Sequence, residues 1–76
     1  MKEQTRLDAL ALCNAAERMR EAANLLWWAR NPEDGGDGEP PSLKEAQEAH
    51  ADAFITLLRA KYHMRRSLER EETSHD

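Results

Sequence analysis

Apolar residues recur at helical spacing in two long segments of the chain, residues 2–30 and 43–72. Neither segment contains Gly or Pro, and both are rich in Ala, Leu, Glu and Arg, which favour helices. All three Gly and all three Pro lie between these segments. The pattern predicts a helix over about 3–30, a flexible acidic linker over 31–41, a helix over about 43–72 and a frayed tail over 73–76.

Helix stop and start signals flank the linker. Pro32 disfavours helical geometry at Asn31, so the first helix must end near Arg30. Ser42 followed by Glu45 fits a capping box, in which each side chain satisfies a free backbone N–H group of the second helix. Each helix should span about 40 Å, and the linker is long enough to fold them into an antiparallel pair.

One apolar stripe on each helix predicts how the two helices pack. The stripe of the first helix also includes Ala9, Ala16 and Ala23, and that of the second includes Ala46, Ala53 and Ala60. Folding the chain about the linker pairs residues whose numbers sum to about 73, which sets large side chains against small ones. The larger side chains of this predicted seam are Leu12, Met19, Leu26, Trp27, His50, Phe54, Leu57 and Met64. The predicted fold class is therefore all-α, an antiparallel two-helix hairpin.

Several apolar side chains lie away from this seam and are candidates for an interface. They are Leu10, Leu25, Trp28, Ile55, Leu58 and Tyr62. A hairpin has no second layer to cover them, and together they exceed the apolar patch of a usual soluble monomer. A homodimer that forms a four-helix bundle would bury them. Trp28 either packs on the linker or a dimer mate, or anchors a different protein, since Trp is an enriched interface residue.

Composition narrows the class of protein further. The chain has 76 residues, and 12 of its 30 apolar residues are Ala, so its core is thin. It contains no Val, one Ile and one Phe, which argues against strands. Charged residues make up 34%, and no apolar run approaches the ~20 residues of a membrane span. The N-terminus shows no signal-peptide pattern, so we expect a cytoplasmic protein that does not bind membranes.

Positive charge gathers near the far end of the second helix. The residues that could contact a phosphate backbone there are Arg59, Lys61, Arg65 and Arg66. Acidic residues follow them directly, and the net charge of the chain is −4. We therefore expect nucleic acid not to be the main partner, and keep a nucleic-acid-associated regulator as an alternative.

The residue types that most often act in catalysis or metal binding do not form a pattern typical of either function. His50 is expected to be a core histidine, with a pH-responsive role as the alternative. Cys13 borders the seam and is expected to be a small buried apolar residue. The carboxylates Asp34, Asp37 and Glu39 of the linker lack the spacing of an EF-hand loop. We predict no catalytic residue, no metal and no cofactor.

Three features together suggest a class of protein: the run Leu25 to Trp28, the break from Asn31 to Pro41 and the capped helix after Ser42. In size and architecture the chain resembles small phage-encoded helical-hairpin proteins that inhibit host regulators, such as quorum-sensing anti-activators and some anti-CRISPR proteins. The resemblance implies a non-enzymatic inhibitor in the host cytoplasm that occludes a surface of a target protein. The resemblance does not assign a functional role to any residue. A small chaperone or antitoxin-like subunit for one cognate protein is another alternative.

Overall fold

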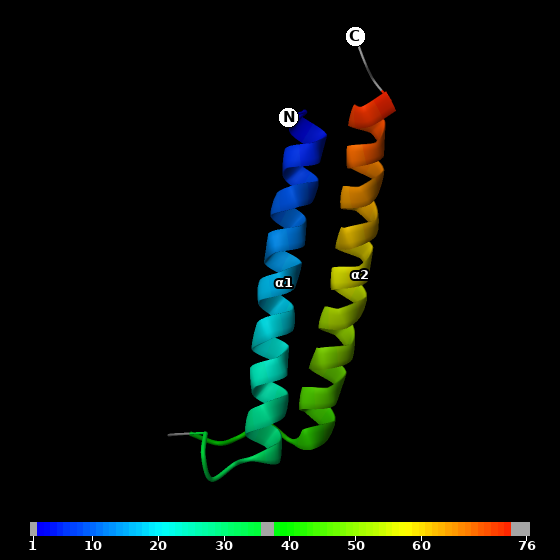
Figure 1. The fold of residues 1–76 in the computed structure, drawn as a ribbon. Helices are drawn as coiled ribbons and strands as arrows, with labels where there is room; N and C mark the ends of the chain where they lie inside the picture. Colours follow the sequence, from blue (N-terminus) through cyan, green and yellow to red (C-terminus); the bar gives the residue numbers. More distant parts are fainter. Residues whose placement is uncertain (1, 36–37, 74–76) are drawn as a thin grey trace.

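Two long helices lie side by side and run antiparallel in the computed structural model, which describes residues 2–35 and 38–73 (Figure 1). Helix α1 spans Glu3–Arg30 and helix α2 spans Leu43–Thr73, within one residue of the expected bounds. The molecule is a rod with extents of 58 × 19 × 12 Å. The predicted all-α hairpin is confirmed. Linker residues 36–37 and tail residues 74–76 lie outside the described residues.

The helix ends next to the linker are closed by the expected residues. The Oγ of Ser42 accepts a hydrogen bond from the backbone N–H of Glu45 at 3.1 Å, which confirms the Ser42 half of the capping box. The backbone N–H of Asn31 donates to the carbonyls of Trp27 and Trp28, and its side-chain Nδ2 donates to Trp27 at 2.9 Å. These bonds satisfy carbonyl groups that the end of α1 would otherwise leave free.

Alanine forms the centre of the interface between the two helices. The buried apolar side chains of the described chain are Ala15, Ala22, Ala46, Ala53 and Ala60. They recur every seven residues on each helix, as packed antiparallel helices require. Because a methyl group occupies little space, the two backbones can approach closely. Half-buried larger side chains flank this alanine seam, namely Leu12, Met19, Leu26, His50, Leu57 and Met64.

Two polar residues extend the seam toward the ends of the chain. Thr5 lies seven residues before Leu12, Ser67 lies seven residues after Ala60, and both are only 2% exposed. The Oγ of Ser67 donates a hydrogen bond to the carboxylate of Asp8. The numbers of this pair sum to 75, close to the predicted 73, so the antiparallel register was predicted to within about half a turn.

The sequence-based seam was wrong at two aromatic residues, at the cysteine and at two alanines. Ala16 and Ala23 are exposed, and the structure buries their neighbours Ala15 and Ala22 instead. Trp27 is 52% exposed and Phe54 is 48% exposed, and Cys13 is exposed as well. Trp27 directly follows the seam residue Leu26, and Phe54 directly follows Ala53. One residue along a helix turns a side chain by about 100°, which is enough to carry each ring out of the seam.

Candidate interaction surfaces

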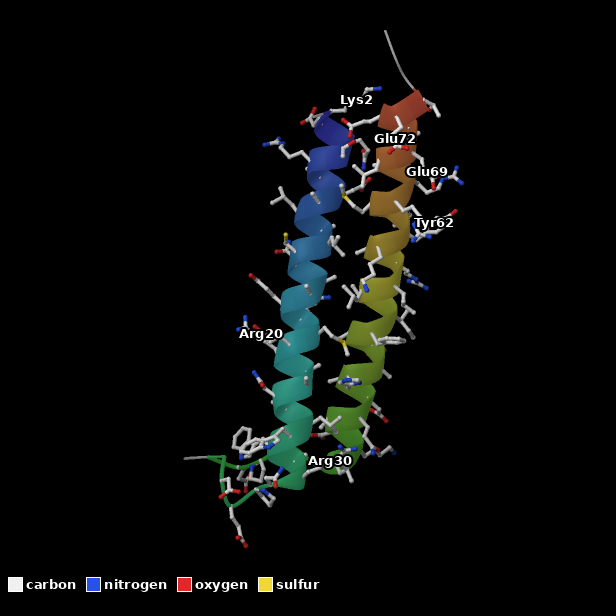
Figure 2. All side chains as sticks on the ribbon, in the orientation of Figure 1. Lys2, Arg20, Arg30, Tyr62, Glu69 and Glu72 are labelled. Carbon is white, nitrogen blue, oxygen red and sulfur yellow. The ribbon has the colours of Figure 1, made fainter. Side chains whose placement is uncertain are left out.

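Helix α2 presents a continuous group of large apolar side chains to solvent. Phe54, Ile55, Leu58 and Tyr62 are all exposed, and Tyr62 is the most exposed of them at 58%. Figure 2 shows Tyr62 pointing away from α1. The four residues lie within about 12 Å along the helix axis, so they form one patch. Of the predicted interface candidates, Ile55, Leu58 and Tyr62 are thus brought together.

Helix α1 exposes its apolar residues at separate places. Leu10 and Leu25 are both exposed, but about 22 Å of helix lies between them. Trp27 offers a larger apolar surface than either, near the end of α1 that joins the linker. The structure does not gather Leu10 and Leu25 with the α2 patch into one surface. Trp27 becomes the principal aromatic candidate on α1, a role for which the sequence favoured Trp28.

Trp28 packs on the linker. Its side chain is partly buried, and a Cβ atom added at Gly35 would overlap the indole ring. The chain therefore needs Gly at this position for the linker to pass so close to the ring. The Nε1 of Trp28 is buried and has no hydrogen-bond partner among the described residues. The sequence analysis left two roles open for Trp28, and packing on the linker agrees with the first of them.

We expect Gly35→Ala to expose Trp28, because the new methyl group and the indole cannot occupy the same space. The measurement is tryptophan fluorescence with acrylamide quenching in a Trp27→Phe background, where Trp28 is the only emitter. The emission should shift to the red and quench more strongly. Glu33→Ala in the same background is the matched control and should leave the spectrum unchanged. Equal spectra for the Gly35 and Glu33 variants would contradict this packing.

The cationic residues of α2 are all exposed to solvent. Arg59, Lys61, Arg65 and Arg66 lie within eight residues of one another. The guanidinium of Arg66 lies 6.0 Å from the ring centroid of Tyr62, at the limit of a cation–π contact. The ring of His63 meets that of Tyr62 edge-on at 5.7 Å. The apolar patch and the cations therefore share one stretch of α2.

A polar cluster joins the helices near the chain ends. The Ser67 hydroxyl donates to Asp8, and the guanidinium of Arg70 donates to the Ser67 Oγ at 3.1 Å. The pKa of Asp8 lies below its ordinary value, chiefly because of the Ser67 hydrogen bond. Desolvation opposes this effect, and Gln4, His63 and Arg70 lower the pKa further by smaller amounts. The sequence assignment missed this cluster. The signal was present, since Ser67 continues the seven-residue row of Ala46, Ala53 and Ala60.

The lowered pKa of Asp8 has a consequence for stability. The unfolded chain binds a proton at this residue more readily than the folded chain does, so the free energy of unfolding should fall as pH drops below about 4. We expect Ser67→Ala to move the pKa of Asp8 up toward its ordinary value, as measured by NMR titration of the carboxyl carbon. Gln4→Ala should shift it less. An unchanged pKa in Ser67→Ala would contradict the assigned cause.

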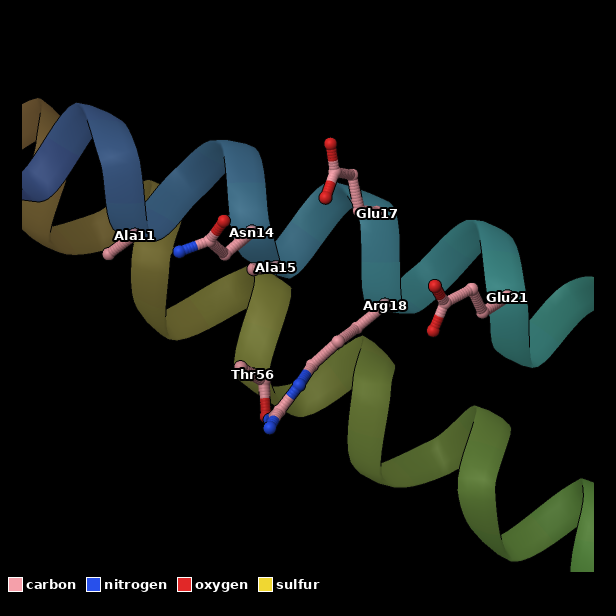
Figure 3. A pocket seen from close by; sticks show the side chains of 7 residues that line it. All are labelled: Ala11, Asn14, Ala15, Glu17, Arg18, Glu21 and Thr56. Carbon is pink, nitrogen blue, oxygen red and sulfur yellow. The ribbon is translucent and has the colours of Figure 1, made fainter.

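A shallow groove runs along one side of the hairpin, with a volume of about 500 Å³. Its lining comes mainly from α1, and Arg18 extends toward Thr56 of α2 (Figure 3). Asn14, Glu17 and Glu21 also line it, and their side chains are exposed. A ligand in this groove would compete with water at these polar groups, which disfavours tight binding of a small molecule.

The part of the chain that the structure describes holds neither a group of metal-binding side chains nor a membrane-spanning helix. Among residues 2–35 and 38–73, no three His, Cys, Asp or Glu side chains are grouped so that they could hold a metal ion. Neither described helix is long and apolar enough to cross a membrane. Comparison of the chain with family models, curated proteins and solved structures found no match.

Proposed function

We propose that this chain is a non-enzymatic protein-binding module that acts as a homodimer on a target protein. The observation that supports the proposal is the distribution of apolar side chains. Alanine fills the seam, whereas Trp27, Phe54, Ile55, Leu58 and Tyr62 are each about half exposed. Burying a side chain of this size contributes roughly 1.5–3 kcal/mol. An interface that buried these exposed side chains would therefore have a large favourable free energy of association.

Two surfaces give the module two roles. The α2 patch of Phe54, Ile55, Leu58 and Tyr62 is continuous and suits an extended helix–helix contact. Trp27 stands apart from it, beside the linker, and suits insertion into a pocket of another protein. A rigid rod with such an anchor can cover a functional surface of its target. We therefore propose inhibition by occlusion, as an inhibitor or anti-activator of a bacterial regulator.

The test is affinity capture from a host lysate with the tagged chain, followed by mass spectrometry. We expect Trp27→Ala to lose the captured protein, because truncating a central aromatic anchor typically weakens binding by about 2–4 kcal/mol, roughly 30- to 1,000-fold. The matched control is the neighbouring Trp28→Ala, which removes a ring that packs on the linker and should retain capture. Both variants should keep the helicity of the wild type by circular dichroism. Capture that survives Trp27→Ala unchanged would sink the proposal that Trp27 is the anchor.

A second candidate function, nucleic-acid binding, has one specific observation behind it. Lys61, Tyr62 and Arg65 line a shallow pocket on α2 together with Leu58. A basic pocket with an aromatic side chain can hold a phosphate and a base. This candidate predicts duplex or single-strand affinity that falls steeply with salt and is lost in Arg65→Ala/Arg66→Ala. Measured affinity without that salt dependence would argue against it.

A further inference from the structure

The side of α2 that faces away from α1 carries one straight row of side chains. Ala51, Ile55, Leu58, Tyr62 and Arg65 follow one another in steps of four, three, four and three residues, and all five are exposed. Steps of three and four keep side chains on one face of a helix. We call these five residues the outer row. Its apolar centre can pack against another helix, because steps of three and four residues add up to the seven-residue repeat of the alanine seam.

Charge is distributed unevenly along α2, with a cationic segment after this centre and carboxylates before it and again over residues 67–73, which carry Glu69, Glu71, Glu72 and one cation, Arg70. Residues 43–53 carry three carboxylates, Glu45, Glu48 and Asp52, and one cation, Lys44. Residues 59–66 carry four cations, Arg59, Lys61, Arg65 and Arg66, and no carboxylate. All eight charged side chains of residues 43–53 and 59–66 are exposed. Leu58 lies between the carboxylates of residues 43–53 and the cations of residues 59–66.

This distribution of charge identifies the occupant of the outer row. We infer that a second copy of this chain covers it, with the two α2 helices antiparallel and Leu58 at the twofold axis. An antiparallel arrangement brings Glu48 and Asp52 of each α2 near Arg65 and Arg66 of the other, and twofold symmetry forms that contact twice. A parallel arrangement would set cations against cations. The inference rests on the homodimer in the proposed function and adds its surface and direction.

The arrangement specifies which residues meet. With Leu58 facing the partner's Leu58, Ile55 faces the partner's Tyr62, and Ala51 faces the partner's Arg65. The large apolar side chains therefore meet at the centre, where water is excluded. Small Ala51 leaves room for the long Arg65 side chain, whose guanidinium can then reach the partner's Glu48 or Asp52.

Disulfide cross-linking tests the direction directly, in a Cys13→Ser background. Ala51 and Arg65 of one copy are about 21 Å apart along the helix, whereas a disulfide requires Cα atoms within about 7 Å. We expect neither Ala51→Cys nor Arg65→Cys to cross-link alone. An equimolar mixture of the two should oxidise to a species of twice 8.7 kDa. Cross-linking of either single variant, as in a parallel dimer, or no cross-linking of the mixture would overturn the inference.

Charge exchange provides an independent measurement. We expect Glu48→Lys/Asp52→Lys and Arg65→Glu/Arg66→Glu each to weaken self-association at low salt by at least about tenfold, because each sets like charges against each other. Mixing the two variants should restore a dimer, which native mass spectrometry would detect as a heterodimer. Unchanged self-association of both variants would contradict the charge argument.

The outcomes separate this inference from the proposed function. If Trp27-dependent capture of a target persists while the cysteine mixture does not cross-link, the direction of the dimer is wrong and the protein-binding role stands. If the mixture cross-links but no target depends on Trp27, the inference stands and the proposed role fails.

Discussion

Replacing Ala15 by Leu should cost the hairpin much of its stability, because Ala15 lies at the centre of the seam with only 2% of its surface exposed. A leucine there must either push the helices apart or adopt a strained conformation, at about 1–3 kcal/mol or more. A core of this size supplies only about 3–5 kcal/mol in total. The measurement is urea unfolding followed by circular dichroism.

The adjacent residue supplies a matched control. Ala16 is exposed on the same helix, so Ala16→Leu makes the same chemical change outside the seam. We expect the free energy of unfolding to change by less than about 0.5 kcal/mol in that variant. If Ala15→Leu and Ala16→Leu unfold at the same urea concentration, the alanine seam is not what holds the helices together.

The second large effect is expected at the centre of the outer row. Leu58→Glu places a charge where the proposed dimer excludes water, and should weaken self-association by about 100-fold or more. Because association stabilises the folded state by mass action, the melting temperature should fall as well and should lose its dependence on protein concentration. Light scattering and thermal melts at several concentrations measure both quantities.

Leu10→Glu is the control for this prediction. Leu10 is as exposed as Leu58, at 53% against 49%, but lies on α1. It should leave the dimer intact. A Leu10→Glu variant that dissociates while Leu58→Glu remains a dimer would move the interface from α2 to α1.

The sequence was sufficient to predict the helices because the end of α1 and the start of α2, next to the linker, are marked by residues with a strong physical effect. Pro32 cannot be preceded comfortably by a helical residue, and Ser42 closes the start of α2. The seam of α2 was equally clear, since Ala46, Ala53 and Ala60 stand seven residues apart. These signals are local, and no tertiary contact competes with them.

The seam of α1 could not be assigned from sequence because alanines occur there in adjacent pairs. Ala15 and Ala16 differ by one residue, and so do Ala22 and Ala23, so two stripes fit the apolar pattern equally well. In each pair the structure buries the first residue. Trp27 was misplaced for a similar reason, since it directly follows the seam residue Leu26. Only the position of the partner helix decides between such adjacent residues.

The buried polar residues were missed for a different reason. Thr5 and Ser67 are polar and were not included in the predicted seam, yet both are small enough for it and are buried. Ser67 becomes acceptable there because it bonds with Asp8 and Arg70. The seven-residue spacing from other seam residues was the available signal for burial. For side chains as small as these, that spacing indicates burial better than polarity does.

We propose that a second copy of the chain completes this thin hairpin. This proposal is tested most directly by the molar mass of the unmodified chain in solution, measured by multi-angle light scattering at low micromolar concentration. We expect twice 8.7 kDa. A single species of 8.7 kDa that remains fully helical at that concentration would contradict it.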